Sequence, residues 1–246
     1  MPFDLKHFSL GETLRCAAGL RGQAKGATSV EEAAQAIARY FYDELQDPAT
    51  GKPSCALVRC YKTHAYGQLP TTLQRSARNV LRRKPHSDNT KCLTLLGTAG
   101  DRPEWNSRLR SLGHQAIPLE SEKMVEQAPM IAQLIREFGL DIASVISPNP
   151  EILRRMEGKS YSTFYVPEAK GSPYIPAQAE FVVREGIESV LGFGGLLRNG
   201  DLIAVILFSR VPIGEETASR FRTLALDVRA ALFLASEIPT FKVEAE

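Results

Sequence analysis

The fold is decided by one stretch near the C-terminus, Phe181-Val-Val-Arg-Glu-Gly-Ile-Glu-Ser-Val-Leu-Gly-Phe-Gly-Gly-Leu-Leu-Arg-Asn-Gly-Asp-Leu-Ile-Ala-Val-Ile-Leu-Phe-Ser-Arg210. Within it, residues 189–197 and 202–209 are apolar runs of strand length, and Asn199-Gly200 lies between them. An Asn-Gly pair readily adopts the positive φ angles that a two-residue hairpin turn requires. The stretch therefore predicts an antiparallel pair of strands at the heart of a sheet.

The rest of the chain alternates between strand-like and helical patterns. Strand patterns cover residues 54–63, 92–98, 114–119 and 160–166, and helical patterns cover 4–26, 30–45, 68–83, 121–138, 150–156 and 215–233. Ser29 and Glu32 have capping-box spacing at the start of the second helix, and Pro129 predicts a helix break near Gln127 or Ala128. This order of elements predicts an α+β fold with a mostly antiparallel sheet and the N- and C-terminal helices on one face.

The hairpin region resembles the GAF family of small-molecule sensory domains. The resemblance is carried by Gly186-Ile187, Ser189-Val190, the Asn-Gly hairpin, the apolar strand at 202–208 and a closing amphipathic helix at 215–233. It implies a GAF-like sheet with a ligand-covering segment on the face away from the terminal helices. The alternative to this resemblance is a purely structural interpretation, in which Gly186 only ends a helix and Ser189 only starts a strand.

The predicted domain organisation follows from this resemblance and from the order of elements. We expect a helical extension at 1–28, one GAF-like domain at 29–236 with a helical insertion around 120–158, and a C-terminal tail at 237–246. A chain of 246 residues is long enough to bury a proper core in this arrangement.

The composition is typical of a soluble globular protein. Hydrophobic residues make up 43% of the chain and charged residues 24%, with a formal net charge of +2. This balance predicts neither nucleic-acid binding nor attraction to a membrane, and no apolar run is long enough to span a bilayer. We therefore expect a cytoplasmic protein with reduced cysteines. The basic run at 75–84 is interpreted as a solvated helix end, with phosphate binding as the alternative.

Residues 167–180 are the strongest candidate for a functional loop. Pro173 and Pro176 stiffen it, whereas Tyr174 and Ile175 are apolar groups that need a partner. In GAF domains the equivalent segment covers the ligand; the alternative is that Tyr174 and Ile175 only fix a long crossover onto the sheet. Small-molecule sites usually place aromatic groups around a few polar ones. The predicted pocket is lined by Tyr165, Tyr174, Ile175, Phe181 and Phe193, with Cys60 or His114 as polar contacts from the opposite wall.

No catalytic constellation is recognisable in the sequence. The four histidines are scattered and have no metal-ligand spacing. Cys55 and Cys60 are five residues apart, which places them on opposite faces of a regular strand. They are interpreted as core fillers, although either pairs with Cys92 if a neighbouring strand brings it close. The glycines between residues 192 and 195 lie in a strand and predict a bulge or a close packing contact instead of a phosphate cradle.

The GAF resemblance implies a sensory or regulatory domain of bacterial type that acts in signal transduction, and the lack of a catalytic constellation predicts no catalysis of its own. The GAF resemblance implies an unidentified small ligand and an output partner such as a kinase or a cyclase; no cofactor is named. The closing helix predicts a homodimer formed with the N-terminal helices, because its apolar face exceeds what one sheet surface covers. That face contains Phe221, Leu224, Ala225, Val228 and Leu232.

Two alternatives stay open at this point. One is a dimerisation module whose pocket is filled by its own side chains. The other is a redox enzyme of the free methionine sulfoxide reductase type that uses Cys55, Cys60 or Cys92.

Overall fold

Six strands form an antiparallel sheet in the order β3-β2-β1-β6-β5-β4. The structure, a computed structural model, describes residues 2–149, 161–234 and 238–242, so the helix expected at 150–156 lies outside the described residues. The strands are β1 (Cys55–Ala65), β2 (Lys91–Gly100), β3 (Ala116–Pro118), β4 (Ser162–Val166), β5 (Ser189–Leu196) and β6 (Leu202–Ser209). The predicted α+β fold class is confirmed, and β6 lies inside the sheet as expected.

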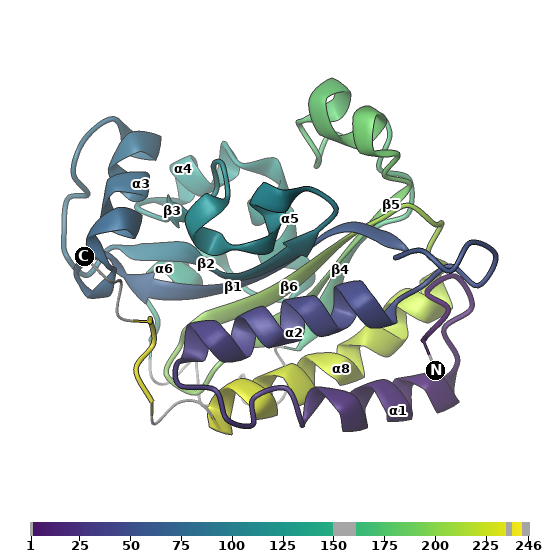
Figure 1. Cartoon of the computed structure of the whole chain (residues 1–246). Helices are drawn as coiled ribbons and strands as arrows, with labels where there is room; N and C mark the ends of the chain where they lie inside the picture. Colours follow the sequence, from purple (N-terminus) through teal and green to yellow (C-terminus); the bar gives the residue numbers. More distant parts are fainter. Residues whose placement is uncertain (1, 150–160, 235–237, 243–246) are drawn as a thin grey trace.

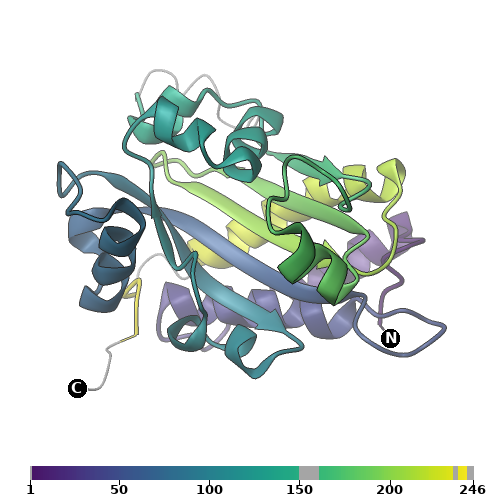
Figure 2. The ribbon, with the colours of Figure 1, turned by 90° about the horizontal axis from the view of Figure 1, so that it is seen from above.

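Helices cover both faces of this sheet. One face carries α1 (Leu10–Leu20), α2 (Val30–Glu44) and α8 (Glu215–Leu234), so the N- and C-terminal helices share a face as predicted (Figure 1). The other face carries α4 (Glu122–Glu126), α5 (Pro129–Glu137), α6 (Ile142–Ile146) and the π-helical turn η4 (Gln178–Val183) (Figure 2). At the β3 edge lie the short turn η1 (Tyr66–Gln68) and α3 (Thr71–Leu81), and η2 (Pro103–Asn106) and η3 (Arg108–Arg110) connect β2 to β3.

Local sequence signals place several of these helix ends. Ser29 caps α2 by accepting a hydrogen bond from the Glu32 N–H at 3.1 Å. The Glu32 carboxylate turns to the N–H and hydroxyl of Thr28 at 2.9 and 2.8 Å, so the reciprocal half of the expected capping box is displaced by one residue. The predicted break is confirmed, since α4 ends at Glu126 and Pro129 opens α5, where a proline costs no hydrogen bond.

The hairpin between β5 and β6 differs from the predicted two-residue turn. Its loop consists of residues 198–200, because the Leu197 N–H donates to the Asp201 carbonyl at 2.8 Å. The Leu197 carbonyl accepts from the Gly200 N–H at 2.9 Å, and of the pair only Gly200 has a positive φ, +80°. This is the arrangement of hairpins in which one left-handed residue forms a bulge. The Asn199 side chain instead accepts from the Asp201 N–H at 3.1 Å and holds the turn.

The two faces of the sheet bury two separate cores. Under the helices, the Phe193 ring packs against Phe41 and Phe221 with centroid distances of 5.3 and 5.2 Å. The opposite core is covered by α4, α5 and α6 and includes Leu134 and Phe164. At Gly194 a Cβ atom would lie 2.0 Å from the Ile203 carbonyl oxygen, which confirms the predicted close packing contact in β5.

A β-bulge overturns the predicted placement of two cysteines. The pairing of β1 with β6 shifts between Cys55 and Leu57, so Ala56 and Leu57 both face the core under α4 to α6. Cys55 and Cys60 consequently lie on the same face, in the core under the terminal helices, and not on opposite faces. The parity rule failed because one extra residue in a strand exchanges its faces.

The apolar face of α8 is covered within one molecule. The sheet, α1 and α2 together bury the residues that the sequence offered to a dimer: Phe221, Leu224, Ala225, Val228 and Leu232. The expectation that this face exceeds what the fold covers was therefore wrong, because α1 adds a second surface beside the sheet. Exposed apolar side chains do remain on these helices, at Leu10, Leu14, Leu226 and Phe233.

Candidate functional site

The covering segment, residues 167–188, is a lobe with its own hydrogen-bonded frame. Its organising residue is Gln178, whose side-chain amide donates to the carbonyls of Ala169 and Ile175 at 3.0 and 2.7 Å. The Gln178 side-chain oxygen accepts from the Gly171 N–H at 2.8 Å. One side chain thus closes the loop on itself, and the lobe projects over one end of the sheet (Figures 1 and 2).

Aromatic and ionic contacts attach this lobe to the sheet. The Phe181 ring packs edge-on against Phe208 of β6 at 4.9 Å between centroids. The Arg210 Nε donates to the Glu185 carbonyl at 2.8 Å, and the Glu185 carboxylate forms an ion pair with Arg102. These contacts give the lobe a defined position instead of a free loop.

A groove of about 430 Å³ runs between the lobe and the segment before α8. Its lining residues are Pro167, Glu168, Lys170, Val182, Val183, Gly186, Ile187, Glu188 and Pro212. Val182 and Ile187 are buried, whereas Val183 is 58% exposed. Known small-molecule sites span roughly 300–1,000 Å³ and combine apolar walls with a few polar groups, and this groove has both properties.

The residues predicted to line one pocket are divided by the sheet. Phe193 and Cys60 are buried in the core under the terminal helices, and the Tyr165 ring packs against that same core. Ile175 and Phe181 belong to the opposite core. The predicted set therefore does not form one cavity, because Cys60, Tyr165 and Phe193 face the terminal helices, whereas the lobe packs on the opposite face of the sheet.

The remaining two predicted residues lie apart from the others. Tyr174 is 36% exposed at the tip of the lobe, and His114 is exposed before β3. Neither lines the groove. The groove uses other residues of the lobe, on both sides of Tyr174 and Ile175. The sequence indicated the correct segment, since Pro167, Glu168 and Lys170 belong to it, but the wrong side chains within it.

Sequence reasoning missed a charged residue in the middle of β1. Arg59 is 8% exposed and shares the face of Leu57 and Tyr61, away from the terminal helices. Its guanidinium donates to the Tyr61 hydroxyl at 3.0 Å and to the Ser111 hydroxyl at 3.1 Å. The signal was present in the sequence, because an arginine interrupts the apolar run at residues 55–61 of this central strand.

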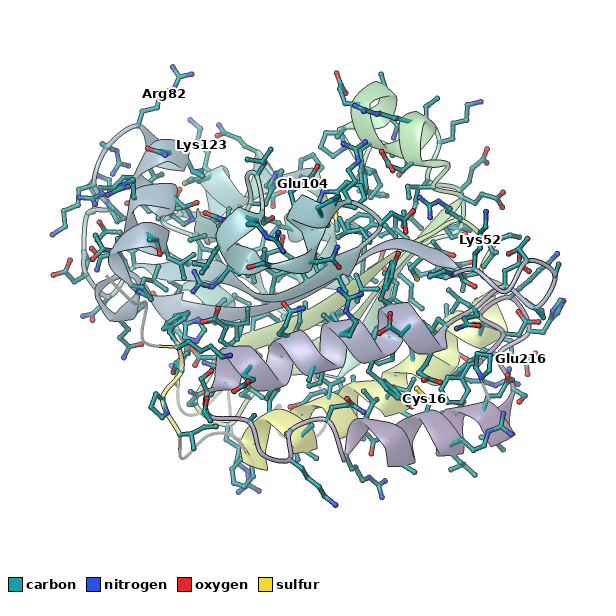
Figure 3. The ribbon with its side chains drawn as sticks, in the orientation of Figure 1. Cys16, Lys52, Arg82, Glu104, Lys123 and Glu216 are labelled. Atoms are coloured by element: carbon teal, nitrogen blue, oxygen red, sulfur yellow. The ribbon has the colours of Figure 1, made fainter. Side chains whose placement is uncertain are left out.

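The four cysteines are buried free thiols. Cys16 lies within the layer of terminal helices (Figure 3), and Cys92 lies at the β3 side of the sheet. Burial raises the pKa of each thiol to about 12. A thiol acts as a nucleophile only as the thiolate, so these side chains behave as small hydrophobic groups at neutral pH. Within the described residues no group of three His, Cys, Asp or Glu side chains is placed to hold a metal ion.

No protein-family model matches the sequence, and no curated protein matches it. Solved structures with a similar fold do exist. The free methionine-R-sulfoxide reductase from Neisseria meningitidis, solved with its substrate, is 12% identical; the match covers 94% of this chain and 97% of that one, with a TM-score of 0.46. The GAF domain of a phosphoenolpyruvate-protein phosphotransferase from Coxiella burnetii is 10% identical over 92% of this chain and 94% of that one, with a TM-score of 0.47.

A third similar structure is the phycoerythrobilin-bound GAF domain of a cyanobacterial phytochrome, with 12% identity, 93% and 95% coverage and a TM-score of 0.40. The chain has the layout that the GAF resemblance of its sequence implied, with an antiparallel sheet, terminal helices on one face and a covering segment on the other. With identities of 10–12% and TM-scores of 0.40–0.47, these likenesses lead to no conclusion about the function of the chain. Across the described ranges no helix is both long and apolar enough to cross a membrane.

Proposed function

We propose that this chain is a GAF-like regulatory domain of signal transduction that binds a small molecule in the groove between residues 167–188 and Pro212. The observation that carries the proposal is the groove itself, whose volume and mixed lining suit a small organic ligand. The buried side chains of Val182 and Ile187 offer an apolar wall. Glu168, Glu188 and Lys170 offer polar contacts of both charges, so a ligand with an apolar body and polar substituents fits best.

The groove is connected directly to the closing helix. The Ser189 hydroxyl donates to the Pro167 carbonyl at 2.8 Å and accepts from the Ile213 N–H at 3.1 Å. Pro212 lines the groove, and α8 begins at Glu215. A ligand that shifts Pro212 therefore acts on the start of α8 through a few bonded residues. We infer that α8 carries the signal towards an output partner such as a kinase or a cyclase.

The same helices support a homodimer in this proposal. Helices α1 and α8 lie next to each other. The rings of Phe8 and Phe221 pack with 5.1 Å between their centroids, and the Arg21 Nε donates to the Asp227 carboxylate at 2.9 Å. Their outer surfaces expose Leu10, Leu14, Leu226 and Phe233. A second copy of the chain would cover these side chains. Light scattering of Leu14→Glu should show a smaller mass than the wild-type protein, whereas Val80→Glu on α3 should not. Equal masses for all three proteins contradict a dimer formed through α1 and α8.

Redox catalysis has less support than ligand binding. Cys55, Cys60 and Cys92 are buried, and their raised pKa values keep them protonated at neutral pH. None of them lines the groove. We therefore infer a domain without a catalytic step of its own.

The binding proposal is tested by filling the groove. The Val183→Trp variant places a large ring at an exposed lining position, and Val80→Trp makes the same change at a position on α3 that is 46% exposed. Each full-length protein is incubated with a cell extract, desalted and denatured, and the released small molecules are identified by mass spectrometry. We expect at least one compound with the wild-type protein and Val80→Trp that is lost with Val183→Trp. Identical profiles for all three proteins would rule the groove out as the binding site.

A further inference from the structure

Arg59 is a buried cation that has no carboxylate partner within the described part of the chain. Of its five N–H donors, one reaches the Tyr61 hydroxyl and one reaches the Ser111 hydroxyl. The Nε atom is fully buried and has no hydrogen-bond partner. Among the described residues no acidic group forms an ion pair with Arg59. A buried charge is costly unless a counter-charge compensates it. The described part of the chain leaves the guanidinium charge of Arg59 uncompensated in this sense.

One other buried cation and two half-buried ones in the described chain differ from Arg59 in this respect. Arg108 binds Glu31 with Nε 2.8 Å from the carboxylate. Lys62 and Lys91 share Asp201, with each ammonium group 2.6 Å from one carboxylate oxygen. In the described chain the buried Arg108 and the half-buried Lys62 and Lys91 are therefore paired with carboxylates, whereas Arg59 is not.

The polar groups around Arg59 are arranged as donors. The oxygens of Tyr61 and Ser111 both accept hydrogen bonds from the guanidinium, so their own protons point elsewhere. The remaining N–H groups of Arg59 and these two hydroxyls therefore form a cluster of donors for which the described residues provide no hydrogen-bond acceptor. Such a cluster suits an oxyanion, because an arginine fork binds a carboxylate or a phosphate through two parallel hydrogen bonds.

A tightly turned loop, exposed at residues 112–114, follows Ser111 of this cluster. Gly113 has φ of +72° and His114 has φ of +54°, an unfavourable conformation for a residue with a side chain. The Gln115 amide holds the loop by donating to the carbonyls of Arg108 and Ser111 at 2.7 and 2.9 Å. Although His114 is exposed, the protein atoms packed around it lower its pKa, and the positive charge of Arg59 lowers it further. The exposed His114 therefore lies close enough to the guanidinium to be affected by its charge.

We propose that Arg59, Tyr61 and Ser111 form a binding site for the carboxylate or phosphate group of a small molecule, entered beside the loop at 111–115. This site is separate from the groove at residues 167–188, since none of these residues lines that groove. It therefore goes beyond the regulatory function proposed above and does not depend on it.

The proposal is tested by titrating the full-length protein with sodium phosphate and with sodium acetate. Isothermal titration calorimetry at constant ionic strength, balanced with sodium chloride, measures the affinity. We expect saturable binding of at least one of the two anions. Arg59→Met should weaken anion binding about tenfold or more, because a hydrogen bond to a charged group is lost. Arg59→Lys should also weaken anion binding, because lysine keeps the positive charge but cannot form the two parallel hydrogen bonds of a guanidinium.

Three controls separate the possible outcomes. Arg75→Met removes an exposed arginine from the basic run at 75–84 and should bind the anion like the wild-type protein; if it alone abolishes binding, the anion sits on that run. Val183→Trp should also bind normally, which distinguishes this site from the groove. The thermal unfolding of Arg59→Met should occur at the same or a higher temperature without anion, since an uncompensated charge is removed. Equal anion affinity in the wild-type protein, Arg59→Met and Arg59→Lys overturns the proposal, as does the absence of saturable binding.

Discussion

The hydroxyl of Ser189 lies 2.8 Å from the carbonyl oxygen of Pro167, so the first residue of β5 holds the start of the covering segment. The same oxygen accepts a hydrogen bond from the Ile213 N–H at 3.1 Å, just before α8 begins. Three segments that are far apart in the sequence therefore meet at one buried side chain. In the proposed function this side chain connects the groove to the helix that carries the signal.

Replacing Ser189 with alanine should destabilise the protein and separate the groove from α8. The buried Ile213 N–H loses its acceptor and the Pro167 carbonyl loses its donor. The loss lowers the free energy of unfolding by about 1–3 kcal/mol. Urea denaturation measures this loss. Ser219→Ala is the matched control, because its hydroxyl binds the Glu216 carbonyl on the exposed side of α8. Equal unfolding free energies for both variants would contradict the role of Ser189.

Phe193 should behave as a core residue and Tyr174 as a surface residue. Phe193 is 0% exposed among the rings of Phe41 and Phe221, whereas Tyr174 is 36% exposed on the lobe. Phe193→Ala should lower the free energy of unfolding by about 3–5 kcal/mol through the cavity it leaves. Tyr174→Ala should cost less than about 1 kcal/mol. Thermal or urea unfolding of the two variants decides the point, and a larger loss for Tyr174→Ala would reverse the assignment.

His64 should make the folded state sensitive to acid. Burial lowers its pKa from 6.5 to about 3, and the charge of Lys62 adds to the effect. Among the described residues neither ring nitrogen has a hydrogen-bond partner, and the ring packs against Phe241. Between pH 6.5 and pH 3, His64 binds a proton in the unfolded chain but stays neutral in the folded chain. The contribution of His64 is therefore complete above pH 6.5 and declines by about 1.4 kcal/mol per pH unit as the pH falls towards 3.

Replacing His64 with leucine removes this titration. The variant should lose stability less steeply than the wild-type protein between pH 6 and pH 4, roughly the interval between the two pKa values, as measured by urea unfolding at each pH. His86→Leu at an exposed position should follow the wild-type curve. Parallel curves for His64→Leu and the wild-type protein would show that His64 is already protonated in the folded state.

The four thiols should react slowly in the folded protein. Each is buried with a pKa of about 12, so only a minute fraction is thiolate near neutral pH. Labelling with iodoacetamide at about pH 8 should be at least about tenfold slower than in urea-unfolded protein. Peptide mass spectrometry assigns the label to each cysteine. A thiol that reacts as fast in the folded as in the unfolded protein would reopen the redox alternative.

Local patterns in the sequence determined the elements and their order. The apolar runs around Asn199-Gly200 became β5 and β6, the capping signal at Ser29 began α2, and Pro129 divided α4 from α5. Each of these features depends on residues within a few positions of one another, because hydrogen bonding in a helix and alternation in a strand are short-range properties. The position of the covering segment after β4 followed from this order as well.

The tertiary structure alone decided which side chains meet. The bulge between Cys55 and Leu57 exchanged the faces of β1, and the sheet separated Phe193 from Ile175. The absence of a carboxylate beside Arg59 among the described residues depends on chain segments distant in sequence. Periodicity states that neighbouring side chains alternate, but it does not state which core each face joins or which partner a buried charge finds. Those outcomes depend on strand register and on long-range packing, where a shift of one residue reverses every face.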